Sequence, residues 1–305
     1  MVTRARRAGY RLLGPRFDYL LHTRPTEWPI MAAHTLVGVV LAIGLDGAMR
    51  GQRVNSALLG VGLWVICLNG GTLALNSAFD RDEGDIAYLR QPPTPPAHLA
   101  RFGFCLMTLG LLGAFVLPAG YRLAYAVCFG LSVLYSVPPF RLKAVPGADW
   151  IINILGFGTL TPYAGWAATG VPLDPTHGLV LLAFGPLFAA LYPLTQIYQQ
   201  EEDRRRGDRT LALLLGVRNS LLVSIAAAGV AFALLGLAGI RAGWGPHDLW
   251  RWLALTLCAL VWGTLLASWL YRHNRMSGRD HQRGMYHALG AWALTDVAVV
   301  MAWGT

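Results

Sequence analysis

Half of the 16 acidic residues in this 305-residue chain fall in two short stretches. One stretch is NSAFDRDEGD at 76–85 and the other is QIYQQEEDRRRGDR at 196–209. Carboxylate and amide oxygens are the ligands that Mg²⁺ prefers, and Mg²⁺ held in this way commonly bridges to substrate phosphates. The arginines beside the acids can form paired hydrogen bonds to phosphate oxygens. The two stretches therefore predict a site for a metal-bound diphosphate.

Polar side chains lead into the first stretch at helical spacing. Asn69, Asn76, Asp80 and Glu83 are separated by seven, four and three residues, which places them on one face of a helix. An asparagine inside a membrane helix is costly unless it has a partner or faces a water-filled cavity. The stripe therefore predicts a cavity that deepens into the membrane and holds a metal ion at its mouth.

The second stretch repeats this pattern. Gln196, Gln199 and Asp203 fall at positions i, i+3 and i+7, with Glu202 beside them. The alternative is that both stretches are solvated loops with their own salt bridges. Two clusters on one membrane face, each preceded by an amide side chain within the membrane, favour the site over the loops.

The elements that position these residues are membrane helices. The chain is 55% hydrophobic and 13% charged, against roughly 25% charged residues in a soluble domain. Its apolar residues form long blocks close to the ~20 residues that a helix needs to cross a bilayer. We therefore predict one all-α, polytopic bundle of about nine transmembrane helices around a central cavity, as a single domain over 1–305. The predicted spans are 28–45, 56–79, 99–117, 121–137, 149–169, 177–198, 217–240, 250–271 and 285–303.

The basic residues predict the orientation of the bundle. With the N-terminus in the cytoplasm, 20 of the 25 Lys and Arg residues fall in cytoplasmic segments, as the positive-inside rule requires. An Arg-rich cytoplasmic segment at 1–24 and the two acidic stretches then share one membrane face. The formal net charge of +9 is therefore read as a topology signal, and no nucleic-acid partner is expected.

A third polar segment, YSVPPFRLKAVPGADW at 135–150, is predicted on the same face. Arg141 and Lys143 are suited to bind a diphosphate, and Lys143 is the only lysine in the chain. The alternative is that the proline pair merely ends a helix and that these cations are topology signals. Tyr135 can shield a carbocation with its ring, and Asn153 can extend the polar lining or form a hydrogen bond between helices.

These segments resemble the UbiA-type superfamily of intramembrane prenyltransferases. NSAFDRDEGD resembles the first Asp-rich motif of that family, and YSVPPFRLK resembles its Tyr-Ser-x-Pro-Pro-x-Arg-x-Lys segment. The second Asp-rich motif and its trailing Gly-x-Arg-Thr-Leu are similar to 196–216, and RPTEWP at 24–29 resembles the entry to the first helix of the family. The resemblance implies a ring of nine helices, a Mg²⁺ cofactor held by both motifs, and transfer of an isoprenyl group from an allylic diphosphate to a lipophilic acceptor within membrane lipid.

The spacing and the resemblance together assign roles to individual residues. Asn76, Asp80 and Asp203 are the predicted catalytic residues. The predicted metal ligands are Asn76, Asp80, Glu83, Asp85, Gln199, Glu202 and Asp203; the predicted diphosphate-binding residues are Arg81, Arg141, Lys143 and Arg209; the candidates for the cavity wall are Asn69, Tyr135, Asn153 and Gln196.

The chain departs from the family pattern at four positions. Ser77 stands where the family usually has Asp, Gly84 stands at its third acid, and Gln196 and Gln199 replace two acids of the second motif. The acceptor therefore stays open among aromatic compounds, quinone precursors and isoprenoids. A membrane terpene cyclase on the same scaffold is the alternative, and a transporter is a third hypothesis.

Two further expectations follow. The preference for arginine over lysine favours a prokaryotic plasma membrane. Asp296, in the middle of the last predicted helix, is either a structural hydrogen-bonding group or part of the cavity wall, and His34 is expected to be packed and hydrogen-bonded.

Overall fold

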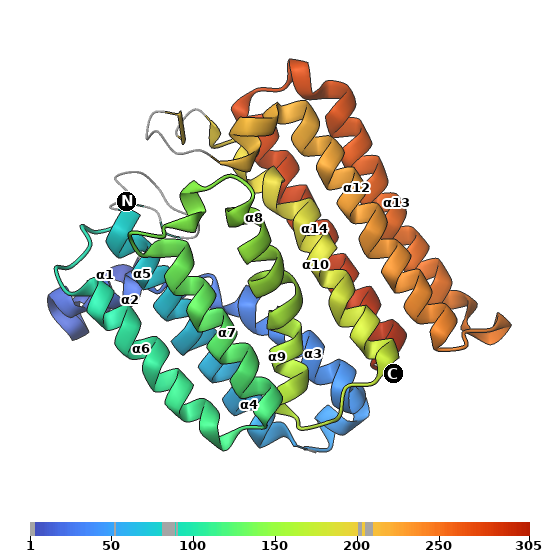
Figure 1. Ribbon diagram of the computed structural model, residues 1–305, viewed down its shortest axis with the longest axis horizontal. Coiled ribbons are helices and arrows are strands. Elements are labelled where there is room, and N and C mark those ends of the chain that lie inside the picture. Colours follow the sequence, from blue (N-terminus) through green and yellow to red (C-terminus); the bar gives the residue numbers. More distant parts are fainter. Residues whose placement is uncertain (1–3, 52, 81–88, 90, 201–202, 205–209) are drawn as a thin grey trace.

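The computed structural model describes residues 4–51, 53–80, 89, 91–200, 203–204 and 210–305. This part of the chain folds as a bundle of helices (Figure 1). Two short helices, α1 (Arg4–Leu13) and α2 (Phe17–His22), precede the bundle. The helices of the bundle are α3 (Trp28–Met49), α4 (Val54–Gly62), α5 (Gly70–Asp80), α6 (Leu99–Gly113), α7 (Ala119–Ser136), α8 (Ala148–Asn153), α9 (Thr161–Ala168), α10 (Pro175–Ile197), α12 (Leu211–Arg241), α13 (Leu249–Arg272) and α14 (Gly278–Trp303).

Two π-helical segments make longer spans out of the short helices. The segment η2 (Leu63–Asn69) joins α4 to α5, and η5 (Ile154–Leu160) joins α8 to α9. In the described part of the chain, seven helical segments are long and apolar enough to cross a membrane. Two more helical stretches, α7 and the run from α8 to α9, lie among them and match the remaining predicted spans. The predicted all-helical membrane fold is confirmed, and the chain is an integral, multi-pass membrane protein.

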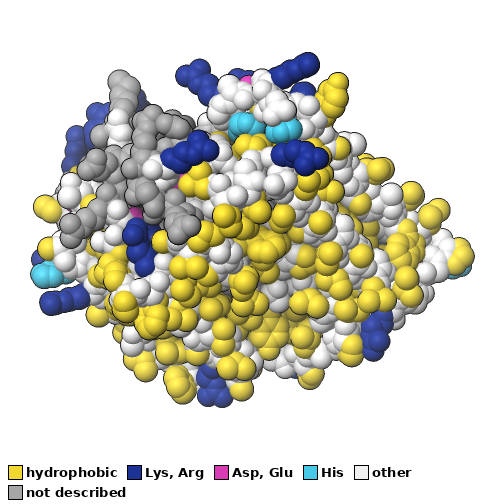
Figure 2. Space-filling view, turned by 45° about the horizontal axis from the view of Figure 1, so that its top comes forward, with side chains coloured by type: hydrophobic (Ala, Val, Ile, Leu, Met, Phe, Trp, Pro, Cys, Tyr) yellow, Lys and Arg dark blue, Asp and Glu magenta, His cyan; other side chains and the backbone are white. Residues whose placement is uncertain are grey.

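The outer surface of the bundle suits a bilayer. Figure 2 shows a broad band of hydrophobic side chains across the face that it draws, with most Lys and Arg side chains toward the top and at the margins. Large apolar side chains such as Phe115, Leu123 and Leu260 are more than half exposed. Hydrocarbon, rather than a protein core, is the partner that such surfaces require.

The interior contains two hydrophobic clusters. One is built mainly by α10, α12, α13 and α14, with Trp262 and Leu235 as central residues. The other is built mainly by α4 to α7 and includes Trp64 and Tyr121. Residues of α3 and α9 belong to both clusters, so these two helices connect the halves of the molecule.

Glycines allow α3 and α9 to lie in close contact. A Cβ atom built on Gly38 would lie 1.7 Å from the carbonyl oxygen of Pro162, and one built on Gly165 would lie 1.9 Å from the carbonyl oxygen of Thr35. Neither position can hold a larger residue without moving a backbone. The crossing of α3 and α9 therefore fixes the spacing between the two halves.

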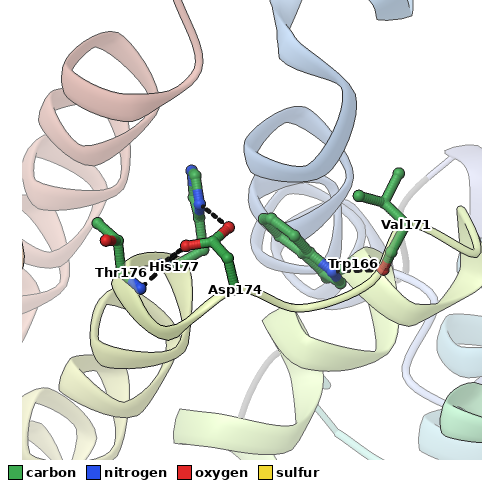
Figure 3. A network of polar contacts seen from close by, with 5 residues as sticks. All are labelled: Trp166, Val171, Asp174, Thr176 and His177. Carbon is green, nitrogen blue, oxygen red and sulfur yellow. Dashed lines mark hydrogen bonds and ion pairs between the residues drawn. The ribbon is translucent and has the colours of Figure 1, made fainter.

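A polar network begins α10 on the side of the bundle that carries the α9–α10 connection (Figure 3). Asp174 is the N-cap of α10 and accepts hydrogen bonds from the backbone N–H groups of Thr176 and His177, at 2.9 and 3.1 Å. The His177 ring lies 2.6 Å from the second carboxylate oxygen. The Trp166 indole N–H donates to the carbonyl of Val171 at 2.9 Å and anchors the end of α9. Such caps satisfy the first N–H groups of a helix, which have no partner within it.

Candidate active site

A cavity of about 1590 Å³ lies between the two halves of the bundle. Its lining comes from α1, α2, α3, η2, α5, α7, α8, η5, α9, α10 and α14 and from the segments between them. Aromatic residues, among them Trp64, Phe157, Phe188 and Trp292, form much of its wall. Asn76 and Gln199 lie toward the helix ends from which the two acidic stretches continue. The cavity is therefore a largely apolar space that is polar where the acidic stretches begin.

The end of α5 carries the acid and amide of the first stretch. Lys143 donates a hydrogen bond to the side-chain oxygen of Asn76 at 3.1 Å and forms an ion pair with Asp80. Arg141 lies 3.5 Å from the same carboxylate. The side chains of Asp80 and Lys143 are each only 12% exposed, so this charge pairing is shielded from water. One amide, one carboxylate and two cations thus meet at the edge of the cavity.

The loop between α7 and α8 brings the two cations to α5. Pro138 and Pro139 follow the end of α7 and cannot continue the helix. Arg141 adopts a left-handed backbone with φ of 37°, and Gly147 has φ of 89°. These turns reverse the chain, and Arg141 and Lys143 point back onto α5. The path of this loop therefore explains how the two cations of the third polar segment reach Asp80 on α5.

Gln196 of the second stretch lies in a different environment. Its amide nitrogen donates to Asp149 at 2.8 Å, and its amide oxygen accepts the backbone N–H of Ala212 at 3.2 Å. Asp149 is fully buried and also accepts the N–H of Gly147 at 2.9 Å. The structure places Gln196 in this network, which connects α8, α10 and the start of α12, and not among the residues that line the cavity.

Two other described residues of the second stretch were predicted to bind the metal. Gln199 lines the cavity and donates to the hydroxyl of Tyr198 at 3.0 Å. Asp203 is largely buried, and the hydroxyl of Thr210 lies 3.4 Å from its carboxylate. The remaining predicted ligands and cations lie outside the described residues; they are Arg81, Glu83, Asp85, Glu202 and Arg209.

The donor set of the site is made of oxygen atoms. Among the residues that the structure describes, no three His, Cys, Asp or Glu side chains are placed together to hold a metal ion. Asn76, Asp80, Gln199 and Asp203 nevertheless offer carboxylate and amide oxygens, which are the donors that Mg²⁺ prefers. The available residues therefore fit a hard divalent cation in chemical type.

The structure places Asn69, Tyr135 and Asn153 on the cavity wall. The Tyr135 hydroxyl lies 3.3 Å from that of Tyr192 on α10. The Asn153 amide donates to the carbonyl of Asp149 at 2.8 Å. Asn69 and Asn153 lie within longer helical runs, whereas Tyr135 lies near the end of α7, just before the loop that carries Arg141 and Lys143.

Sequence reasoning gave no role to the pair formed by Arg24 and Glu27. Both side chains are at least nine-tenths buried, and both line the cavity just before α3 begins. Burial raises the pKa of the Glu27 carboxyl, and the nearby Arg24 charge partly opposes that rise. The signal in the sequence was two opposite charges directly before an apolar span, within the RPTEWP segment.

A second pair lies within the membrane-spanning part of the bundle. The Nδ1 atom of His34 on α3 lies 3.4 Å from the carboxylate of Asp296 on α14. The Nε2 atom of His34 lies 3.2 Å from the carbonyl of Phe157, and the ring packs edge-on against Phe184 and Trp292. His34 is packed and hydrogen-bonded as expected; it lines the cavity, and Asp296 is its ion-pair partner.

The helices enclose a large, mainly apolar cavity, and a cluster of acidic, amide and basic side chains lies at its edge. These are the features expected of an intramembrane prenyltransferase. The chain belongs to the UbiA prenyltransferase family, whose model matches residues 31–290. The resemblance predicted from the sequence is therefore confirmed. The chain is similar to a lycopene elongase/hydratase of Haloferax volcanii, with 28% identity over 74% of this chain and 75% of that protein. It is also similar to a probable homogentisate phytyltransferase 2 of Oryza sativa, with 31% identity over 68% of this chain and 62% of that protein.

Solved structures share the fold. A UbiA homolog from Archaeoglobus fulgidus, bound to GPP and Mg²⁺, superposes with a TM-score of 0.65 over 93% of this chain and 99% of that chain, at 19% identity. A digeranylgeranylglyceryl phosphate synthase superposes with a TM-score of 0.69 over 94% of this chain and 97% of the other, at 14% identity. At these identities the structures establish the common architecture.

Proposed function

We propose that this prenyltransferase moves an isoprenyl group from an allylic diphosphate to a lipophilic acceptor, with Mg²⁺ as cofactor. The observation that carries the proposal is the cluster of Asn76, Asp80, Arg141 and Lys143 at the edge of a large apolar cavity. The curated relatives named above and the homolog bound to GPP and Mg²⁺ support the same chemistry.

The charged cluster would hold the diphosphate. Asn76, Asp80, Gln199 and Asp203 would bind Mg²⁺, together with the predicted ligands that lie outside the described residues: Glu83, Asp85 and Glu202. When bound, Mg²⁺ would neutralise charge on the leaving diphosphate. Arg141 and Lys143, with the predicted Arg81 and Arg209, would donate hydrogen bonds to its oxygens.

The cavity would control what happens to the isoprenyl group. The C–O bond breaks, and its electron pair leaves on the diphosphate; a π-electron pair of the acceptor then forms the new C–C bond, and the acceptor gives up a proton to the released diphosphate. The cations would stabilise the negative charge that develops on the leaving group as the bond breaks. The aromatic wall formed by Phe157, Phe188 and Trp292 excludes water that would otherwise capture the allylic cation.

The hydrogen bonds of Gln196 remove one of the two reasons to consider cyclisation. The replacement of two acids by Gln196 and Gln199 was the reason to consider a terpene cyclase. Because Gln196 has a structural partner in Asp149, its presence needs no change in the reaction.

The orientation and extent of the protein are part of the proposal. The distribution of basic residues supports a cytoplasmic N-terminus, with the acidic stretches on the cytoplasmic face of a prokaryotic plasma membrane. The whole chain, 1–305, would form one catalytic domain.

The test is Mg²⁺-dependent release of pyrophosphate from a long allylic diphosphate by the purified protein in lipid nanodiscs. Asp80→Asn should reduce the rate at least about 100-fold, because it removes a carboxylate from the charge cluster. Asp46→Asn is the matched control, since the Asp46 side chain is 79% exposed and far from the site. Release that does not need Mg²⁺, or that survives Asp80→Asn, would contradict the proposal. Adding candidate acceptors then separates transfer, which consumes an acceptor, from cyclisation, which does not.

A further inference from the structure

Two π-helical segments face the deep part of the cavity. Trp64 and Leu68 of η2 line it, as do Gly156 and Phe157 of η5. The π-helix is rare and is often found at functional sites. A segment of this kind in each of two spans, both at the same cavity, indicates that this region is built for a ligand.

Hydrogen bonds join the two segments. The Trp64 indole N–H donates to the hydroxyl of Thr161 at 3.2 Å, and Thr161 donates to the carbonyl of Gly156 at 2.8 Å. Trp64 lies in η2, Gly156 lies in η5, and Thr161 directly follows η5. The two segments are therefore neighbours.

An asparagine stands at one end of each segment. Asn69 is the last residue of η2, and Asn153 directly precedes η5. Both line the cavity, with exposed fractions of only 5% and 9%. Asn69 is separated from the charge cluster by depth, because it lies seven residues before Asn76, about 10 Å along the helix.

The hydrogen bonds of the two amides leave capacity for a ligand. The amide nitrogen of Asn69 is buried and has no hydrogen-bond partner in the part of the chain that the structure describes. The Asn153 amide donates to the carbonyl of Asp149 and also interacts with the hydroxyl of Tyr135, and because its oxygen has two acceptor sites it can still accept a bond from a ligand. Thr72 and Ser132, also on the cavity wall, bond to each other at 2.8 Å. Asn69 therefore differs from other polar residues on this wall, such as Thr72 and Ser132, in having a nitrogen without a partner among the described residues.

We propose that Asn69 and Asn153 form a subsite that binds an oxygen substituent of the acceptor. The ligand class is an aromatic ring that bears a hydroxyl or carbonyl group, in preference to a pure hydrocarbon. An asparagine amide can donate to such an oxygen and accept from its hydroxyl hydrogen. The stacked rings of Phe157 and Phe188, with centroids 5.5 Å apart, provide an aromatic wall in the same cavity. This inference rests on the proposed function and specifies its acceptor.

The experiment compares Asn69→Leu and Asn153→Leu with the wild type. Asn55→Leu is the control, because Asn55 is exposed on α4 of the same helical run. Each protein is assayed with a long allylic diphosphate and two acceptors, a dihydroxybenzene and the matching methyl-substituted benzene. We expect Asn69→Leu to raise the KM for the dihydroxybenzene about tenfold, with the KM for the donor unchanged. The preference for the dihydroxybenzene should shrink by the same factor, because a polar subsite rejects ligands that lack the oxygen.

Thermal unfolding distinguishes binding from a structural role. Because the Asn69 amide has an unpartnered nitrogen, Asn69→Leu should preserve or raise the melting temperature. A conservative variant, Asn69→Thr, keeps a hydrogen-bonding group and should restore part of the preference. A lower melting temperature together with an unchanged KM for the acceptor would show a structural role and overturn the inference.

The remaining outcomes separate the subsite from the proposed function. If the wild type releases pyrophosphate and prefers the hydrocarbon, or if both leucine variants keep the preference for the dihydroxybenzene, the subsite is disproved and the prenyltransferase activity stands. If the wild type releases no pyrophosphate with any acceptor, both proposals fail.

Discussion

The two acidic stretches begin with amide side chains that have different surroundings. Asn76 lies on the cavity wall, and its oxygen accepts a hydrogen bond from Lys143 beside Asp80. Gln196 turns away from the cavity and bonds to Asp149 and to the backbone of α12. Similar residues at comparable places in two similar motifs thus serve the reaction site in one case and the packing of helices in the other.

This difference shows what a buried amide needs. A polar group within a membrane bundle must find a partner. The partner of Gln196 is the buried carboxylate of Asp149. The partner of Asn76 is Lys143, which also pairs with Asp80 and is suited to bind a phosphate. The chemistry of the partner, more than the residue type, decides which role the amide has.

The largest expected effect is at the lysine that joins the two residues of the first stretch. Lys143→Met should lower pyrophosphate release by roughly 100- to 1,000-fold, because it leaves a shielded carboxylate without its nearest cation. Lys143→Arg, which keeps the charge, should retain a measurable part of the activity. A Lys143→Met variant within about threefold of the wild type would remove the first stretch from the reaction site.

A stability test separates Asn76 from Gln196. Gln196→Leu removes one donor from Asp149 and leaves the N–H of Ala212 unpaired, so the free energy of unfolding should fall by about 2–4 kcal/mol. Asn76→Leu should instead lower activity and change unfolding less. Thermal unfolding in detergent micelles and pyrophosphate release are the two readouts.

A double substitution sharpens this test. In Asp149→Asn with Gln196→Glu, the donor and the acceptor of this bond exchange places, and the bonds to the N–H groups of Gly147 and Ala212 can form again. The double variant should therefore be more stable than either single variant. Equal losses in the single and double variants would show that the position of the charge, and not the hydrogen bonding, holds α8 to α10.

His34 and Asp296 test the same idea in the membrane interior. Asp296→Asn keeps an oxygen that can accept from the Nδ1 atom of His34 and should change the free energy of unfolding by less than about 1 kcal/mol. Asp296→Leu removes the partner and should cost about 1–3 kcal/mol. If both variants unfold alike, the pair does not depend on hydrogen bonding. The measurement is again thermal unfolding in micelles.

The smallest expected effect is at the cap of α10. Burial raises the pKa of Asp174, but hydrogen bonds from His177 and Thr176 outweigh this and hold the pKa below its usual value. A lowered pKa in the folded state stabilises the protein above the unfolded-state pKa of about 4, and the contribution is lost as the pH falls below it. Asp174→Ala should cost about 1 kcal/mol at neutral pH and less in acid. A pH-independent difference between this variant and the wild type would contradict the assignment.

The fold could be predicted from the sequence with few errors. Hydropathy gave the spans, because that signal is local. The residue types of the cluster at Asp80 could also be predicted, because the positive-inside rule places the first acidic stretch and the segment with Arg141 and Lys143 on the same membrane face. The partner of Gln196 could not be predicted, because Asp149 lies 47 residues away and only the folded structure brings the two together. The π-helical segments η2 and η5 also left no periodic signal that differs clearly from an ordinary helix.

The crossing of α3 and α9 has a consequence for how such enzymes diversify. Gly38 and Gly165 keep two backbones so close that the distance between the halves is set by main-chain atoms, independently of the side chains on the cavity wall. Residues such as Phe157 or Phe188 can therefore change size without moving the frame around them. In a saturation mutagenesis experiment, positions 38 and 165 should accept only glycine, while the cavity wall should tolerate replacements that retune the choice of substrate. A rigid helix crossing beside a cavity with replaceable side chains lets one scaffold acquire new lipid substrates by single substitutions.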